Sequence, residues 1–553
     1  MFFRPGNGSL RRSPLISVFV FLFFTTLPFT MAACGGSSSP VTSTRNTPVP
    51  AAQEVLTLPN VGTSEISTLD PAQGPDQNSA LAVGMIYSGL VRTDKNLNVI
   101  PDQATWQSSA DDTVYTFTLK PGLTFSDGTP VTAHDYVYTW TRALLPATKS
   151  PVASFFEAQI VGADAVSSGK STTLAGVKAL NDVTLQVTLK GPTPYFLEEL
   201  TTSLFFPLNK KVIDQFGDKD WAQHVVGNGV GTGPFMVKQW VHNAKMVLIP
   251  NPHYYGNKTR LHEVDMVFVS DPATAFKSYQ ANQYSLVWNI DGNDQLGAST
   301  LPGFTRQALL QTDMLFFDNT QPPFNNVAVR QAFAYAIDKT TLANTVLKGS
   351  VQPASTIIPP GMPGYQPNYA GLGFDAAKAK ALFQSVYPDV TKVPPITFSY
   401  PNSQVSSLEA QALQQMWQNA LGIQVKLLPV ELTAYNDETA HHLVQFGFTQ
   451  WGADFPDPYD WLTLNLFSTA SNNNGSWHNA RFDQLVTQAE TKSGSERIAL
   501  YHQAEQLAIT DVGWLPLDHQ TLAAVIPPQV HGVTLNGNGL YFGDWSGVYL
   551  SQR

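Results

Sequence analysis

Apolar and polar positions repeat along the chain with two different periods, and each period predicts one kind of element. Tyr115, Phe117 and Leu119 alternate with threonines, which is the pattern of a half-buried strand. In NNVAVRQAFAYAIDK the apolar residues instead recur at the spacing of one helix face, at Val329, Ala332, Phe333, Ala336 and Ile337. Segments of both kinds alternate to the C-terminus without an internal repeat, so we expect a mixed α/β fold.

A few residues with special backbone roles predict where elements begin and end. Thr132 followed by Asp135 has the spacing of a helix N-terminus with a capping box. Gly422 is expected to end a helix that begins near Ser407 and leads into a strand. The Gly-rich segment GNGVGTGPFMVKQW lacks the third glycine of a dinucleotide fingerprint, so we predict a turn that leads into the strand FMVKQW.

The N-terminus has the pattern of an export signal. Arg4, Arg11 and Arg12 precede an apolar run from Leu15 to Phe29, and small residues follow. We therefore expect residues 1–33 to be a signal peptide. No other run of 18 apolar residues occurs, so the rest of the chain is not expected to span a bilayer.

Cys34 is the only cysteine in the chain and directly follows Met-Ala-Ala. An exported protein with one cysteine cannot close an internal disulfide, and the site resembles the lipobox of a bacterial lipoprotein. Residues 34–51 are rich in Gly, Ser, Pro and Thr, which is typical of a flexible tether. These features predict a lipid anchor at Cys34, with ordinary secretion as the alternative.

Composition limits the possible functions. The chain has 553 residues, 43% hydrophobic and 13% charged, which predicts a folded protein of two or three domains. Its net charge of −10 argues against a nucleic-acid partner. We find no HExxH, Walker or GxSxG motif and no cysteine cluster, so no cofactor, metal or catalytic residue is expected.

The segment FTQWGADFPDPYDW places three carboxylates, Asp454, Asp457 and Asp460, among aromatic rings. Their spacing does not fit an EF-hand loop, and Pro456 and Pro458 exclude a helix that would align them. A metal site and a glycosidase acid pair remain minor alternatives. Asp457 and Asp460 are best interpreted as turn and capping acids around a buried tryptophan.

Several segments in order resemble the extracytoplasmic solute-binding proteins of family 5, the oligopeptide- and dipeptide-binding lipoproteins of peptide ABC transporters. The similar segments are YTFTLKPGLTFSDGTPVTAHDYVYTW, GTGPFMVKQW with NPHYYG, NNVAVRQAFAYAIDK, QWGADFPDPYDW and SNNNGSWHNARFDQLV. The resemblance implies a two-lobed, type II periplasmic-binding-protein fold with an additional third domain and the ligand enclosed between the lobes. It places lobe I at 52–84, 210–298 and 522–553, the third domain at 85–209, and lobe II at 299–521.

The resemblance also implies a ligand site. Asp454 would pair with the N-terminal ammonium of a peptide, and backbone groups of Gln450, Trp451 and Gly452 would pair with the peptide as an added strand. A facing strand would come from the turn Gln73–Pro75, which includes Gly74, and Trp451 and Trp477 would line side-chain pockets.

The chain departs from the family pattern at two positions. Phe448 stands where some members have a basic residue, and Val152 stands where they have a tyrosine. Both differences concern how the C-terminus of the ligand is held.

The function expected from the resemblance is that of a membrane-tethered subunit of an ABC importer. It would capture peptides outside the cytoplasm and deliver them to the permease, as a monomer and without enzymatic activity. The alternative is the same fold with a non-peptide solute, an oligosaccharide or a metal chelate. A secreted hydrolase that uses Asp454 with a partner acid is the third hypothesis, and the absent catalytic motifs argue against it.

Overall fold

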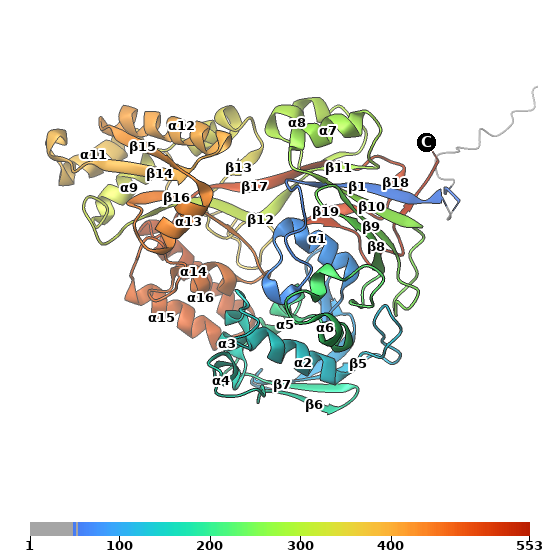
Figure 1. Ribbon diagram of the computed structural model, residues 1–553. Helices are drawn as coiled ribbons and strands as arrows, with labels where there is room; N and C mark the ends of the chain where they lie inside the picture. The colour runs from blue at the N-terminus through green and yellow to red at the C-terminus, as the bar shows by residue number, and fades with distance from the viewer. Residues whose placement is uncertain (1–47, 51–52, 553) are drawn as a thin grey trace, which may run out of the picture. The chain divides into compact units, whose positions relative to one another are not determined.

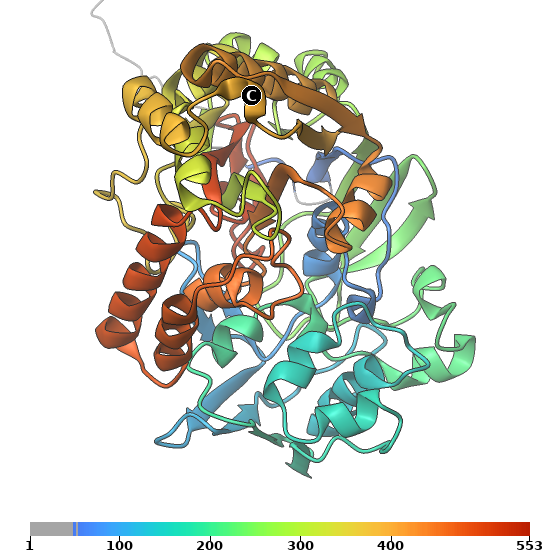
Figure 2. The same cartoon turned by 90° about the vertical axis from the view of Figure 1, so that its left-hand side faces the viewer.

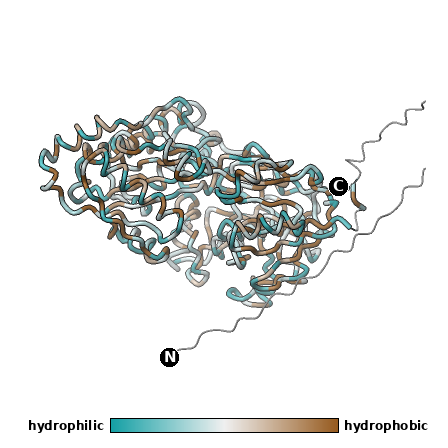
Figure 3. Tube along the Cα trace, turned by 90° about the horizontal axis from the view of Figure 1, so that it is seen from above, coloured by the Kyte–Doolittle hydropathy of each residue, from teal (hydrophilic) through white to brown (hydrophobic). Residues whose placement is uncertain are grey.

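The computed structural model describes residues 48–50 and 53–552. The predicted signal peptide, Cys34 and most of the tether lie outside these residues. The mixed α/β class is confirmed, and apolar and polar stretches alternate along the whole described chain (Figure 3). Among the residues that the structure describes, no helix combines the length and the apolar character that crossing a bilayer requires.

A four-stranded sheet forms one part of the molecule. Its strand order is β1 (Val55–Val61), β10 (Glu263–Val269), β9 (Lys245–Pro250) and β8 (Phe235–Val241). β1 runs parallel to β10, and the other pairs are antiparallel. The helices α7 (Pro272–Gln280) and α8 (Gly292–Ala298) lie beside this sheet (Figure 1). The predicted strand FMVKQW is confirmed as β8.

A larger sheet is built around two long strands. Its order is β11 (Val287–Trp288), β17 (Leu515–Val525), β12 (Phe304–Phe317), β16 (Phe446–Gly452), β14 (Ile396–Pro401) and β15 (Val425–Val430), and β13 (Val351–Pro353) also pairs with β17. β12 and β17 run from the strands beside α12 (Gln404–Leu421) to those beside α7 and α8 (Figure 1).

A third sheet has the order β4 (Ala104–Ser108), β5 (Val114–Leu119), β7 (Thr184–Thr188) and β6 (Val177–Asn181). Tyr115, Phe117 and Leu119 of β5 are buried, as their alternation predicts. The helix α2 (Ala133–Leu144) packs on this sheet and begins with the predicted capping box of Thr132 and Asp135. Its Trp140 is fully buried, so the apolar face of α2 closes this sheet.

The other helices mostly surround the larger sheet. α9 (Val327–Tyr335) buries three of the predicted apolar positions, and the last two, Ala336 and Ile337, are buried just after its end. α12 ends at Gly422, whose backbone is left-handed. The remaining helices of eight or more residues are α1 (Gln77–Ile86), α11 (Ala376–Val386), α13 (Leu432–Ala440), α15 (Ala480–Glu490) and α16 (Gly494–Thr510).

Three clusters of buried apolar side chains hold these layers together. Core 1 draws on 56–87, 208–298 and 522–548, core 2 on Ala72 and 90–205, and core 3 on 310–517. In Figures 1 and 2 the elements around core 2 lie close to one another and at a distance from α12. β17 contributes Leu515 and Leu517 to core 3 and Leu522 to core 1, so this strand joins two cores. The exact domain boundaries stay a prediction.

A close backbone contact fixes the end of α1. The amide of Gly233 donates to the Ile86 carbonyl (2.8 Å). A Cβ at Gly231 would lie 2.1 Å from the same oxygen, which no side chain tolerates. Gly231 and Gly233 thus let this turn approach the end of α1, and Gln77, Ala80 and Val83 of α1 line a cavity.

Candidate functional site

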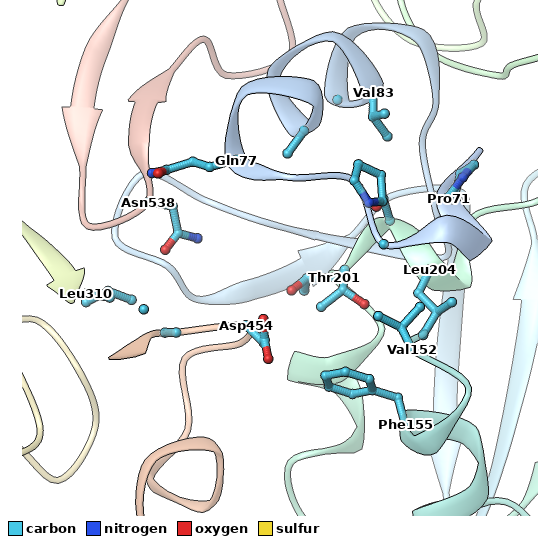
Figure 4. A pocket seen from close by; sticks show the side chains of 18 of the residues that line it. Pro71, Gln77, Val83, Val152, Phe155, Thr201, Leu204, Leu310, Asp454 and Asn538 are labelled. Atoms are coloured by element: carbon cyan, nitrogen blue, oxygen red, sulfur yellow. The ribbon is translucent and has the colours of Figure 1, made fainter. Parts of the chain in front are cut away.

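A cavity of about 640 Å³ is lined by residues that belong to or surround each of the cores 1, 2 and 3. Its walls include Gly74 and Pro75, the α1 face around Gln77 and Val83, the segment 201–204, and the end of β16 (Figure 4). The hairpin of β19 (Thr534–Asn536) and β20 (Gly539–Tyr541) adds Asn538. Within the described part of the chain, Asp454 is the one charged residue that lines this cavity.

β16 presents an unpaired backbone edge beside the cavity. β14 pairs only with Phe446 and Gly447 of β16, while β12 pairs along the whole strand. In an antiparallel ladder alternate residues turn their backbone groups to the partner strand. The amide of Ala453 donates to Leu310 of β12 (2.8 Å), so the alternation turns Gln450 and Gly452 toward the opposite edge. An extended ligand can pair with that edge as an added strand.

Asp454 follows directly after this edge. Its backbone amide donates to Oδ2 of Asp460 (3.1 Å), which fixes the turn that carries it. Its side chain is exposed to the water of the cavity, yet the surrounding protein reduces its solvation and raises the pKa of the Asp454 carboxyl to about 6. A carboxylate with weakened solvation and no cationic partner among the described residues is suited to bind a cation.

The other two acids of the segment have structural partners, as the sequence interpretation expected. Asp460 is fully buried and accepts from the Trp451 indole (3.3 Å), and desolvation raises its pKa well above the usual range. Asp457 forms a bidentate pair with Arg497 of α16, with both distances 2.6 Å. No group of three or more metal-ligating side chains occurs in the part of the chain that the structure describes.

Aromatic residues of the same segment hold two parts of the molecule together. The ring of Phe455 packs against Phe155 and Tyr195 at centroid distances of 6.4 and 5.8 Å. Tyr459 stacks on Tyr195 at 4.2 Å. These rings therefore fix the turn that carries Asp454 against the β4–β7 part of the structure.

The predicted site residues are only partly brought together. Asp454, Gly452, Gln450 and Gly74 line the cavity, whereas Trp451 lines a neighbouring one. The strand alternation also turns the backbone of Trp451 toward β12 instead of toward the free edge.

The prediction for Trp477 does not match the structure. Trp477 is only 2% exposed, packs on Phe482 at a centroid distance of 5.0 Å, and lines neither cavity. It belongs to core 3, because an apolar ring is most stable where a buried cluster surrounds it.

The turn Gln73–Pro75 differs from the expected facing strand. Residues Pro71–Gln73 form a short 3₁₀ helix that Gly74 ends with a left-handed backbone. Gly74 and Val152 lie against each other on the cavity wall, since a Cβ at Gly74 would be 3.0 Å from Val152. Thr201 and Asn538 also line the cavity, and the sequence did not predict them because only tertiary contacts bring their loops there.

The sequence profile of the bacterial extracellular solute-binding proteins, family 5 (middle), matches residues 98–473. The oligopeptide-binding protein OppA of Bacillus subtilis is 31% identical over 503 residues, which cover 87% of this chain and 91% of that protein. The probable deoxycholate-binding periplasmic protein YgiS of Escherichia coli is 33% identical, with 89% and 92% covered.

Solved structures agree with the profile. The murein tripeptide-binding protein MppA of Escherichia coli superposes with a TM-score of 0.76 at 28% identity, covering 90% of this chain and 99% of that chain. The similarity confirms the type II, three-domain architecture that the sequence resemblance implied.

Proposed function

Because the chain belongs to the bacterial extracellular solute-binding proteins of family 5, we propose that it captures peptides by their free N-terminus and backbone and delivers them to the permease of an ABC importer. As a member of this family it is an extracytoplasmic binding protein and not an enzyme. The peptide as ligand and the permease as partner are the parts that need an experiment.

The observation that carries the proposal is the place of Asp454. This carboxylate is the charged residue of the cavity wall and directly follows the free edge at Gln450 and Gly452. A peptide paired along that edge can present its ammonium to Asp454, while main-chain hydrogen bonds provide affinity that does not depend on sequence. Sugars lack an ammonium, and a bile-acid anion would meet a like charge at Asp454.

The probable deoxycholate-binding relative is the reason to test a second candidate, a non-peptide solute in the same cavity. Gentle ionisation of purified residues 52–553, followed by release and fragmentation of co-purified ligand, distinguishes the two. We expect masses that fragment into a ladder of amino-acid residues. Hexose-spaced masses, a metal chelate or a steroid mass would contradict the proposal.

We further propose that the protein is anchored to the outer face of the cell membrane through a lipid on Cys34. The sequence pattern at 31–34 and the tether that follows support this anchor. Cys34→Ser is expected to abolish the incorporation of a labelled fatty acid into the protein. Equal labelling of both forms would rule out the anchor.

A further inference from the structure

A second cavity, of about 650 Å³, lies beside β16 next to the free edge at Gln450. Its lining includes residues of α12 and α13 and, from β16, Phe448, Thr449, Gln450 and Trp451. Gln450 lines both cavities, so a ligand paired along β16 passes both. The second cavity is therefore in reach of a side chain of a ligand whose backbone occupies the first.

The charged or acidic side chains on the wall of the second cavity are all carboxylic acids. Asp313 of β12 and Glu409 of α12 line it, and no Lys, Arg or His does so within residues 48–50 and 53–552. The oxygens of Asp313 accept from the side-chain amides of Gln450 (2.6 Å) and Gln520 (2.8 Å). Asp313 is thus already held by two neutral donors.

Glu409 differs from Asp313 because it has no such donor. Only 6% of Glu409 is exposed, and its carboxyl has neither a hydrogen bond nor an ion pair to any described residue. Desolvation and the nearby Asp313 raise the pKa of Glu409 to about 8. Asp518, also buried, lies near both acids, and desolvation together with their charges raises its pKa well above the usual range. A buried carboxyl without a partner is costly to keep, and a cation at hydrogen-bond distance offsets that cost.

The basic residues near these acids do not pair with Glu409, and Lys339 interacts with Asp518 instead. Burial lowers the pKa of Lys339 to about 7, and its Nζ donates to the Ala354 carbonyl (2.9 Å). Lys339 does not line the cavity. His519 is buried between Thr312 and Thr356, and desolvation lowers its pKa to about 3, which keeps it uncharged. Neither residue therefore supplies a positive charge to Glu409.

The rest of the wall suits a long side chain with a positive end. Aromatic rings of Phe448, Tyr435, Trp451 and Trp514 line the cavity. Such rings pack on the methylene stem of lysine or arginine and attract its cation through their faces.

We propose that the second cavity receives a lysine or arginine side chain of the bound peptide, with Glu409 as the carboxylate that pairs with it. This inference rests on the proposed function, because it requires a peptide in the first cavity. It assigns to the protein a preference for peptides with a cationic residue and makes Glu409 a specificity-determining residue.

Calorimetry with a pentapeptide of alanine tests the proposal. Lysine and its uncharged analogue norleucine are placed at each position in turn, and the readout is the ratio of their affinities within one protein. We expect lysine to bind at least tenfold more tightly than norleucine at one position. Glu409→Gln should reduce this ratio to below threefold. Glu496→Gln, which changes an exposed glutamate of α16, should retain the ratio.

A measurement on the unchanged protein covers the case in which Glu409→Gln does not fold. A cation at Glu409 lowers the pKa of that carboxyl, so the lysine peptide should release protons at pH 7 that the norleucine peptide does not. Calorimetry in buffers of different ionisation enthalpy detects this release.

Two outcomes overturn the inference while peptide binding stands. One is that lysine gives no advantage at any position and releases no protons, although the alanine peptide binds. The other is that the advantage persists in Glu409→Gln. If no peptide of the series binds, the proposed function fails and the inference fails with it.

Discussion

Replacement of Asp454 by asparagine is expected to weaken the binding of a free-amine peptide by about 30-fold to several thousandfold. Truncating one partner of a charge pair that becomes buried on binding costs about 2–5 kcal/mol, and about 1.4 kcal/mol corresponds to tenfold in affinity. Asparagine keeps the shape of Asp454 but not its charge, so the ammonium would enter the cavity without an anion. Calorimetry of the same peptide on both proteins measures the loss.

N-acetylation of the peptide provides the matched test. It removes the ammonium from the other side of the pair, so the acetylated peptide should bind Asp454→Asn and the unchanged protein nearly equally. Asp182→Asn, at an exposed aspartate far along the chain, should not change the affinity. A difference below threefold between free and acetylated peptide on the unchanged protein would show that Asp454 does not anchor the amine.

The proposed pair of Asp454 and the peptide ammonium determines how the preference for a free amine depends on pH. The carboxylate form of Asp454 binds the ammonium, and the pKa of the unliganded group is raised to about 6. Protonation therefore competes with binding as the pH falls through about 6, and the free-amine advantage should be complete above that pH and smaller at pH 5. An advantage that does not change between pH 7.5 and 5 would assign the anchor to another group.

Replacement of Arg497 by methionine is expected to destabilise the folded protein by about 3–5 kcal/mol. The change leaves the Asp457 carboxylate buried without its bidentate partner, and an uncompensated buried charge costs about that much. The guanidinium also lies over the rings of Tyr195 and Tyr501, at 5.4 and 4.9 Å from their centroids. Because the entropy of unfolding grows with chain length, we expect the melting temperature of the unit 45–553 to fall by about 3–5 °C if it unfolds as one.

A neighbouring exposed pair supplies the control. Lys492 and Glu496 lie 2.9 Å apart at the start of α16, and both are exposed to solvent. Such surface pairs contribute about 0–1 kcal/mol, so Lys492→Met should change the melting temperature little. The double change Arg497→Met with Asp457→Leu should recover part of the stability, because it removes both charges. Equal effects of Arg497→Met and Lys492→Met would mean that the buried pair contributes no more than a surface pair.

Sequence patterning predicted the elements that depend on neighbours in the chain. The alternation in β5, the apolar face of α9 and the capping box of α2 all depend on residues at most eight positions apart. Their physical causes, side-chain direction and local hydrogen bonds, act over the same short range. Elements of this kind could therefore be predicted from the sequence alone.

The residues of the site were predicted with mixed success, because their surroundings depend on elements that are distant in the chain. Asp454 was singled out from an unusual local composition, together with family resemblance, and it does line the cavity. Trp477 has similar local features, yet it packs into core 3. Whether an aromatic ring faces a ligand or a core depends on which distant elements pack around it, and no local pattern contains that information.

By itself the sequence determined the α/β class, the strands and helices with clear periods, and the segment that carries the charged residue of the cavity. Only the tertiary structure decided that β14 leaves the end of β16 unpaired and that Asp313 and Glu409, 96 residues apart in the chain, line one cavity. It also decided that Glu409 has no partner. The physical reason is that solvation and pairing of a charge depend on everything packed around it, whereas periodicity records only the direction of each side chain along its own element.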